Sequence, residues 1–282
     1  MEYREIPPRP ELAEQVECFW LLTSPATEAN QEPQRILPDG CIELIFNFGD
    51  LFQRRLENGR TEEQGRALVA GQMERAIRIR PTGRVRLLGL RFRPGGAHGY
   101  LGFPLEELTN RVVELEGAMG GRARGVVDEV HNARGRLEAK AALEQNLLEL
   151  LHEPSEAERR VEAAVIAVLA ARGAVSLERL AWDLGISGRQ LSRQFRRLVG
   201  LGPKQFCRII RFQQVFKLVE QGQRVSWAEV AAECGYYDQA HLINEFREFS
   251  GETPPELFMQ QAPLTHHFTR RGRVSEISKP AQ

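Results

Sequence analysis

The sequence has no excess of charge of either sign. Its 282 residues include 38 Lys or Arg and 38 Asp or Glu, which gives a formal net charge of zero. Overall charge therefore predicts no class of partner. The chain is long enough for two domains, and its composition of 42% hydrophobic and 27% charged residues is that of a globular protein.

The sequence also lacks a long apolar run. The longest stretch of small and apolar residues, AAVIAVLAA at 163–171, is far shorter than the roughly 20 residues of a membrane-spanning helix. The opening MEYREIPPRP is polar and rich in proline. We therefore expect no secretory signal, no membrane association and a cytoplasmic location.

Metal-binding and catalytic patterns are absent as well. The four cysteines show no C-x-x-C spacing and the six histidines show no H-x-x-x-H or H-E-x-x-H spacing, so we expect reduced thiols and no metal site. The sequence contains no P-loop, nucleotide-binding fingerprint or G-x-S-x-G. We therefore expect no cofactor and no enzyme. An enzyme domain fused to a binding module stays open as an alternative, because carboxylates on a β scaffold leave no motif.

Short runs of strand length fill the first part of the chain, separated by turn sequences such as Pro38-Asp39-Gly40. They are VECFWLL at 16–22, CIELIFNF at 41–48, ALVAG at 67–71, AIRIR at 76–80 and VRLLGLRF at 85–92. Since no long helix separates them, residues 1–120 are predicted to form a β-sandwich or small barrel. Residues 93–115 are expected to form a loop and short helical pieces.

The rest of the chain has helical patterns. Residues 121–153 are predicted to be a helical connector whose apolar stripe packs on the domains or on another copy of the chain. Residues 154–260 are predicted to be all-helical, with Ser155, Ser187, Ser226, Asp238 and Thr253 capping helices. Residues 261–282 are expected to be a disordered tail. The predicted fold class is therefore multidomain α+β.

Two segments of the helical part repeat one pattern. In Ala181–Pro203 and in Ala231–Pro254, an alanine and a glycine precede a polar helix with apolar and Phe residues four apart, followed by glycine and proline. The triplets Leu191, Phe195, Leu198 and Leu242, Phe246, Phe249 each share one helix face and should be buried. A short helix, a glycine turn and a second helix with a polar outer face are typical of a helix-turn-helix unit.

The outer faces of the two second helices differ in charge. The first is centred on Arg189, Arg193 and Arg196 with Ser192 on its flank, and the second on Ala240, Asn244 and Arg247 with Ile243 on its flank. Residues 172–217 hold ten basic and two acidic residues, a net charge of +8, whereas 218–258 hold two basic and eight acidic residues, a net charge of −6. Because phosphate attraction dominates affinity for DNA, the first unit is predicted to supply most of the binding.

The connection between the two units predicts how they would be spaced. A helix from Pro203 to Val219 has about 17 residues and is about 25 Å long. A helix of this length can place two recognition helices near one turn of B-DNA apart, about 34 Å. One chain could then enter two successive major grooves.

Residues 176–258 resemble the DNA-binding domain of the AraC/XylS family of bacterial transcription regulators. The resemblance is carried by Leu180-Ala181, Gly185, Ser187, Leu191, Arg193, Phe195, Gly200 and Pro203, and by Val230-Ala231, Gly235-Tyr236, Leu242, Phe246, Gly251, Thr253 and Pro254. It implies base contacts by Arg189, Ser192 and Arg193 and by Gln239, Ala240, Ile243 and Asn244. Gln190, Arg196 and Arg247 complete the predicted interface. The family usually carries Arg or Lys where this chain has Asn244.

The first part of the chain also resembles a domain found on a subset of AraC-type regulators, through YREIPP, WLL, RILPDGCIELIF and GLRFRPGG. The resemblance implies effector binding or dimerisation, and sugar-sensing relatives use a cupin-like barrel. The candidate effector pocket comprises Trp20, Cys41, Glu43, Phe92, Arg93 and His98. The predicted partners are double-stranded DNA, RNA polymerase, a small-molecule effector and a second copy of the chain. A constitutive DNA-binding or bridging factor without small-molecule control is the alternative function.

Overall fold

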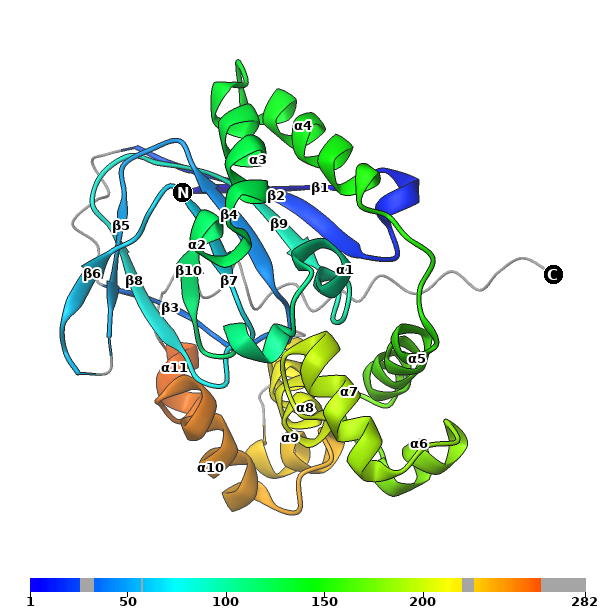
Figure 1. The fold of residues 1–282 in the computed structure, drawn as a ribbon. Coiled ribbons are helices and arrows are strands. Elements are labelled where there is room, and N and C mark those ends of the chain that lie inside the picture. The colour runs from blue at the N-terminus through cyan, green and yellow to red at the C-terminus, as the bar shows by residue number, and fades with distance from the viewer. Residues whose placement is uncertain (26–32, 57, 220–225, 260–282) are drawn as a thin grey trace.

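The computed structural model of this chain describes residues 1–25, 33–56, 58–219 and 226–259, and it has two parts (Figure 1). The amino-terminal part contains two antiparallel sheets with helices on one side, and the carboxyl-terminal part is entirely helical. The predicted order of a β-rich domain followed by an all-α domain is confirmed.

Six strands form the larger sheet, in the spatial order β1-β2-β9-β4-β7-β10. Their bounds are Glu2–Ile6 (β1), Val16–Ser24 (β2), Val85–Phe92 (β9), Glu43–Asn47 (β4), Ala67–Ala70 (β7) and Val112–Glu114 (β10). The smaller sheet has the order β3-β8-β5-β6, with bounds Gln34–Ile36, Ile77–Pro81, Phe52–Arg55 and Thr61–Glu63. All five predicted strands are present. The structure adds β1, β3, β5, β6 and β10, the last within a segment for which no strand was predicted.

The two sheets enclose one apolar layer. Trp20 of β2, Phe52 of β5 and Leu87 of β9 are buried there, with the half-buried Ile79 of β8 packed against them. Trp20 is 1% exposed and its indole stacks on the Tyr3 ring with the centroids 5.9 Å apart. Of the two predicted architectures, the sandwich is therefore the one observed.

Helices cover the other face of the larger sheet. These are α2 (Leu115–Met119), α3 (Gly121–Asn132) and α4 (Arg136–Glu149), and Figure 1 shows α3 and α4 beside β2 and β4. Val130 and Leu143 are fully buried in the same cluster as Phe46 and Leu88 of the sheet. Of the two predicted packing partners, the domains or another copy of the chain, the apolar stripe of residues 121–153 thus packs on the sheet of the same chain. The short elements η1 (Pro10–Leu12), α1 (Ala97–Leu101) and η3 (Leu105–Leu108) add Leu12, Tyr100 and Leu105 to this core.

The carboxyl-terminal part consists of seven helices among the described residues, around one core. They are α5 (Glu156–Ala170), α6 (Leu177–Asp183), α7 (Gly188–Val199), α8 (Pro203–Val219), α9 (Trp227–Glu233), α10 (Gln239–Ser250) and α11 (Pro254–Met259). The predicted inward triplets of α7 and α10 are all at most 5% exposed. Ser155 and Glu158 form the predicted capping box, and Ser187 and Asp238 cap α7 and α10. Ser226 occupies the N-cap position before α9, but its side chain makes no capping bond, so that prediction is wrong.

The two parts of the molecule are joined by direct contacts. The Ala76 amide donates to the Phe249 carbonyl at 2.7 Å, and the Gln213 side chain donates to the Pro38 carbonyl. Arg35 pairs with Glu252, and the Thr109 hydroxyl donates to the carbonyl of Gly200. The β-rich part is therefore fixed to the ends of both α7 and α10.

Gly89 offers a test of the sandwich core. It pairs with Trp20 in the register of β9 and β2, and a Cβ at Gly89 would lie 1.9 Å from Trp20 Cε2. Gly89→Ala should lower the free energy of unfolding by about 1–3 kcal/mol or more, because the indole has no free space to move into. Urea denaturation would measure this change.

Gly125→Ala is the matched control, since a Cβ at Gly125 on α3 meets nothing within 4 Å. Alanine is favoured over glycine in a helix by about 0.5–1 kcal/mol, so this variant should be equal to or more stable than the original chain. Equal stability of the two variants would contradict the tight packing of Trp20 on β9.

Candidate DNA interface

Helix α7 presents its arginines because its opposite face is buried. The Ser187 side chain accepts from the Gln190 amide at the start of the helix, and Gly200 ends it with φ 94°, a left-handed conformation that favours glycine. The Phe195 ring packs on Phe206 of α8 with the centroids 5.4 Å apart. Leu191 and Phe195 therefore fix which side faces the core, and the opposite side faces solvent.

The exposed side of α7 collects the residues predicted for the first unit. Arg189, Arg193 and Arg196 are exposed, whereas Gln190 and Ser192 are half-buried. All five, together with Ser187, line one surface hollow of about 620 Å³. Among the described residues, none of these arginines forms an ion pair. This face offers guanidinium donors that are free to contact phosphates or guanine edges.

Helix α10 has the same construction with less charge. Asp238 Oδ1 accepts from the His241 amide at 2.7 Å, and Gly251 ends the helix with φ 82°. Phe246 packs on Phe212 of α8 with the centroids 5.0 Å apart. Gln239, Ala240, Asn244 and Arg247 are exposed, and the half-buried Ile243 packs against the core.

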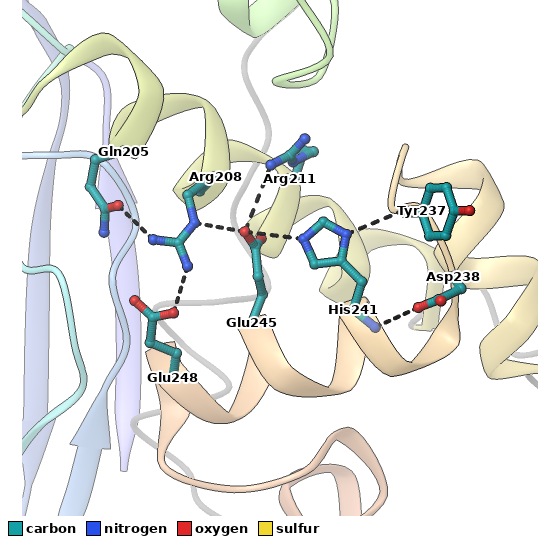
Figure 2. Close-up of polar contacts among 8 residues, drawn as sticks. All are labelled: Gln205, Arg208, Arg211, Tyr237, Asp238, His241, Glu245 and Glu248. Carbon is teal, nitrogen blue, oxygen red and sulfur yellow. Dashed lines mark hydrogen bonds and ion pairs between the residues drawn. The ribbon is translucent and has the colours of Figure 1, made fainter.

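An ion-pair cluster connects α10 to α8 (Figure 2). The Nε of Arg208 donates to Glu245 Oε1 at 2.6 Å and a terminal nitrogen donates to Glu248 Oε2 at 2.6 Å. Arg211 lies 3.8 Å and His241 Nε2 3.5 Å from the same Glu245 oxygen. The Glu245 side chain is 8% exposed, so three cationic or ionisable side chains surround a buried carboxylate. This cluster sets the position of α10 along α8.

Five of the eight acidic residues counted in the second unit have structural partners. Glu245 and Glu248 bind Arg208 on α8, Glu252 binds Arg35 of the sheet, and Asp238 and Glu256 accept bonds at the starts of α10 and α11. The outer face of α10 carries Asn244 and Arg247 and no carboxylate among its predicted contact residues. The net charge of −6 is therefore not the charge of the face that α10 presents.

The candidate effector residues lie in more than one place. Trp20 is buried between the sheets and its side chain interacts with Glu43, and Glu43 and Cys41 belong to a buried charged cluster with Arg91, whose Nε donates to Glu43 Oε1 at 2.8 Å. Arg91 also lies 3.6 Å from Asp39. Burial raises the pKa of the Glu43 carboxyl to about 7, although the Arg91 guanidinium lowers it. Asp39 belongs to the Pro38–Gly40 loop, which contacts α8 through the bond from Gln213 to the Pro38 carbonyl.

Phe92, Arg93 and His98 lie near a cavity between the two parts. Arg93 Nε donates to the Ala13 carbonyl at 2.8 Å, and His98 Nδ1 lies 3.5 Å from Glu158 of α5. The cavity has a volume of about 110 Å³, and its lining includes Phe92, Gly96, Tyr100, Leu147, Val161 and Leu198. It thus combines residues of β9, α1, α4, α5 and α7. Sequence reasoning missed Leu147, Val161 and Leu198, because each fits the ordinary apolar stripe of its helix.

Comparisons with known proteins match both parts of the chain. Residues 180–260 match the family described as a helix-turn-helix domain, and residues 4–114 match a family described as a domain of unknown function (DUF6597). The HTH-type transcriptional regulator GbdR of Pseudomonas aeruginosa, in strains UCBPP-PA14 and PAO1, is 32% identical over 93 residues. The match covers 32% of this chain and 24% of GbdR, so the chain spans about a quarter of the length of these relatives.

Solved structures with similarity include ToxT from Vibrio cholerae and the AraC-like transcriptional activator CuxR. ToxT has a TM-score of 0.44 at 11% identity, covering 86% of this chain and 99% of ToxT. CuxR has a TM-score of 0.27 at 14% identity, covering 77% of this chain and 86% of CuxR.

The carboxyl-terminal part is therefore a helix-turn-helix domain with two units, α6–α7 and α9–α10. Its sequence is homologous to that of an AraC-family regulator, GbdR, over 93 residues. No helix among the described residues has the length and hydrophobicity needed to span a membrane.

The cluster around Glu245 predicts a specific loss of stability. In Arg208→Ala the buried Glu245 loses its closest cation, and removing one partner of a buried pair typically costs about 3–5 kcal/mol. Because Arg211 still approaches Glu245 at 3.8 Å, we expect a value at or below the lower end of that range. Denaturant unfolding measures the loss, and amide exchange should locate the increased opening in α10.

Arg179→Ala is the control for this experiment. Arg179 pairs with Asp183 at 2.9 Å, but both side chains are more than half exposed. Such surface pairs contribute about 0–1 kcal/mol, so this variant should be close to the original in stability. If Arg208→Ala lost as little stability as Arg179→Ala, the role assigned to the cluster would be contradicted.

Proposed function

We propose that the chain is a sequence-specific DNA-binding transcription regulator that places α7 and α10 in successive major grooves. The observation that carries the proposal is the presence of two exposed polar helix faces on one seven-helix core, joined by the 17-residue α8. A helix of 17 residues is about 25 Å long, which is compatible with half-sites one helical turn apart. The matched family is described as a helix-turn-helix domain, and the curated relative GbdR is an HTH-type transcriptional regulator.

The residue types of the two faces support different contributions. Arg189, Arg193 and Arg196 of α7 can bind phosphates or grip guanine edges through two parallel bonds. Gln239 and Asn244 of α10 can exchange two hydrogen bonds with adenine, and Ala240 can contact a thymine methyl group. The first helix supplies charge, and the second supplies neutral hydrogen-bonding and apolar contacts.

The amino-terminal part is proposed to modulate this binding by sensing a small molecule. The support is the cavity of about 110 Å³, because its lining includes Leu198 of α7 as well as Phe92 of the sandwich. A ligand in this cavity would contact both parts and could shift the position of α7. RNA polymerase and a second copy of the chain remain predicted partners.

Thermal unfolding of the full chain across a metabolite panel tests the sensing role. A true ligand should raise the unfolding temperature of the original chain and have little effect on Val161→Trp, which fills the cavity. If no compound shifts the temperature and DNA affinity is constant, the constitutive factor is the better description.

Selection of bound duplexes from a random DNA pool at near-physiological salt tests the proposed function itself. Two enriched motifs about ten base pairs apart would support two-groove docking. A single motif would limit sequence recognition to one unit. Absence of enrichment, with and without candidate effectors, would contradict the proposal.

The contributions of the two helices can be separated on the selected duplex. Arg193→Ala should weaken binding by about 1–3 kcal/mol and relax the preference at one base pair if its guanidinium grips a base edge, and should lower the salt dependence if it binds a phosphate. Asn244→Ala should weaken binding less and leave the salt dependence unchanged, because Asn244 is neutral. Fluorescence anisotropy titrations at several salt concentrations measure both effects.

Arg124→Ala on α3 is the control, since this exposed arginine lies outside the helix-turn-helix domain. It should bind DNA like the original chain. A greater loss for Asn244→Ala than for Arg193→Ala would show that α10, not α7, dominates.

A further inference from the structure

A row of arginines crosses the smaller sheet. In the register of the three strands β3, β8 and β5, Arg78 is paired with Arg35 on one side and with Arg55 on the other. Directly opposed residues share a face of the sheet, with their Cβ atoms about 4.5–5.5 Å apart, and like charges in such positions are destabilising. The strand register thus places three guanidinium groups where they repel one another.

The row is only partly neutralised. Arg35 pairs with Glu252, but Arg55 and Arg78 are exposed and form no ion pair with any described residue. The same holds for the exposed Arg75, which precedes β8. An anionic partner would remove the repulsion, which makes this face suited to a polyanion.

These arginines border a cleft next to the second recognition helix. The cleft has a volume of about 1200 Å³ and is lined by Arg55, Arg75 and Arg78 of the β-rich part and by Arg247 and Gly251 at the end of α10. Of its two acidic lining residues among the described ones, Glu248 is paired with a cation, while Glu74 accepts a hydrogen bond from a neutral amide and keeps its charge. The Asn110 side chain donates to Glu74 Oε2 at 2.7 Å, and Arg208 binds Glu248.

The position of the cleft relative to α10 is fixed by backbone and side-chain contacts. The Ala76 amide, between Arg75 and β8, donates to the Phe249 carbonyl, and Arg35 holds Glu252 just beyond α10. Arg247 belongs both to the cleft and to the exposed face of α10, where it lies one turn after Asn244. The basic cleft is therefore continuous with the surface predicted to enter the second groove.

We propose that this cleft, formed by Arg55, Arg75, Arg78 and Arg247, binds the DNA phosphate backbone beside the second recognition site. The inference rests on the proposed DNA-binding function and extends the interface to the β-rich part of the chain. Duplex DNA carries one negative charge per about 1.7 Å, and arginine binds phosphate through two parallel bonds. Continuity with α10 favours DNA over an acidic protein as the occupant.

The test uses the full-length chain, a selected duplex that extends ten base pairs beyond the second half-site, and a shorter duplex that ends there. Each neutralised phosphate contributes about 0.9 to the slope of log affinity against log salt. Arg55→Ala/Arg78→Ala should therefore reduce the slope by about 1.8 on the long duplex. Between 50 and 200 mM salt, this slope difference corresponds to about a tenfold smaller loss of affinity. The same variant should bind the short duplex like the original chain.

Two further variants distinguish charge from folding. Arg55→Lys/Arg78→Lys keeps the charge and should retain the slope, whereas Arg4→Ala removes an exposed arginine from β1 and should change nothing. The alanine pair should unfold at the same temperature or higher, since it removes a repulsion.

An unchanged slope for the alanine pair, with binding by the original chain intact, would overturn the inference and leave an acidic protein surface as the next occupant to test. An equal loss on both duplexes would overturn it as well. If the original chain binds no duplex, the proposed function fails together with this extension of it.

Discussion

The geometry of the proposed interface depends on the contacts that the buried Glu245 carboxylate makes. Two recognition helices can enter successive grooves only if their separation and rotation are fixed, and α8 is the element that connects them. Phe195 packs α7 on α8 through Phe206, and Phe246 packs α10 on α8 through Phe212. Aromatic packing alone permits some sliding, whereas a slide of α10 along α8 would break the pairing of Arg208 with Glu245 and Glu248.

The sequence was sufficient for features whose determinants are local. The α7 and α10 triplets, the Ser155 capping box and the 17-residue α8 depend on residues within one or two helical turns, and all of them are present. Strands β3, β6 and β10 have three residues each, which is too short for an alternation of apolar and polar residues to be recognised in the sequence. Ser226 shows the limit of local reasoning, because it occupies the cap position without making the bond.

Features that depend on register or on distant contacts could not be predicted. The arginine row requires that residues 35, 55 and 78 lie opposite one another, and no spacing along the chain reveals a strand register. The sequence does not decide what the apolar stripe of residues 121–153 packs against, since Val130 and Leu143 would be buried equally well by a sheet or by a second copy of the chain. The cavity beside Leu198 is lined by residues of five elements that are far apart in the sequence, so no local pattern predicts it.

The contacts between the two parts explain why the acidic second unit is compatible with the proposed role in DNA binding. A separate helix-turn-helix unit with a net charge of −6 would repel the phosphates around its groove. Here Glu245, Glu248 and Glu252 are directed at Arg208 and Arg35, so they hold the unit in place. Positive charge is supplied from outside the unit, because the β-rich part, which contacts the end of α10, carries Arg55, Arg75 and Arg78. The helix-turn-helix domain and the β-rich part would then form one binding surface, and a ligand that moved one part against the other would alter its continuity.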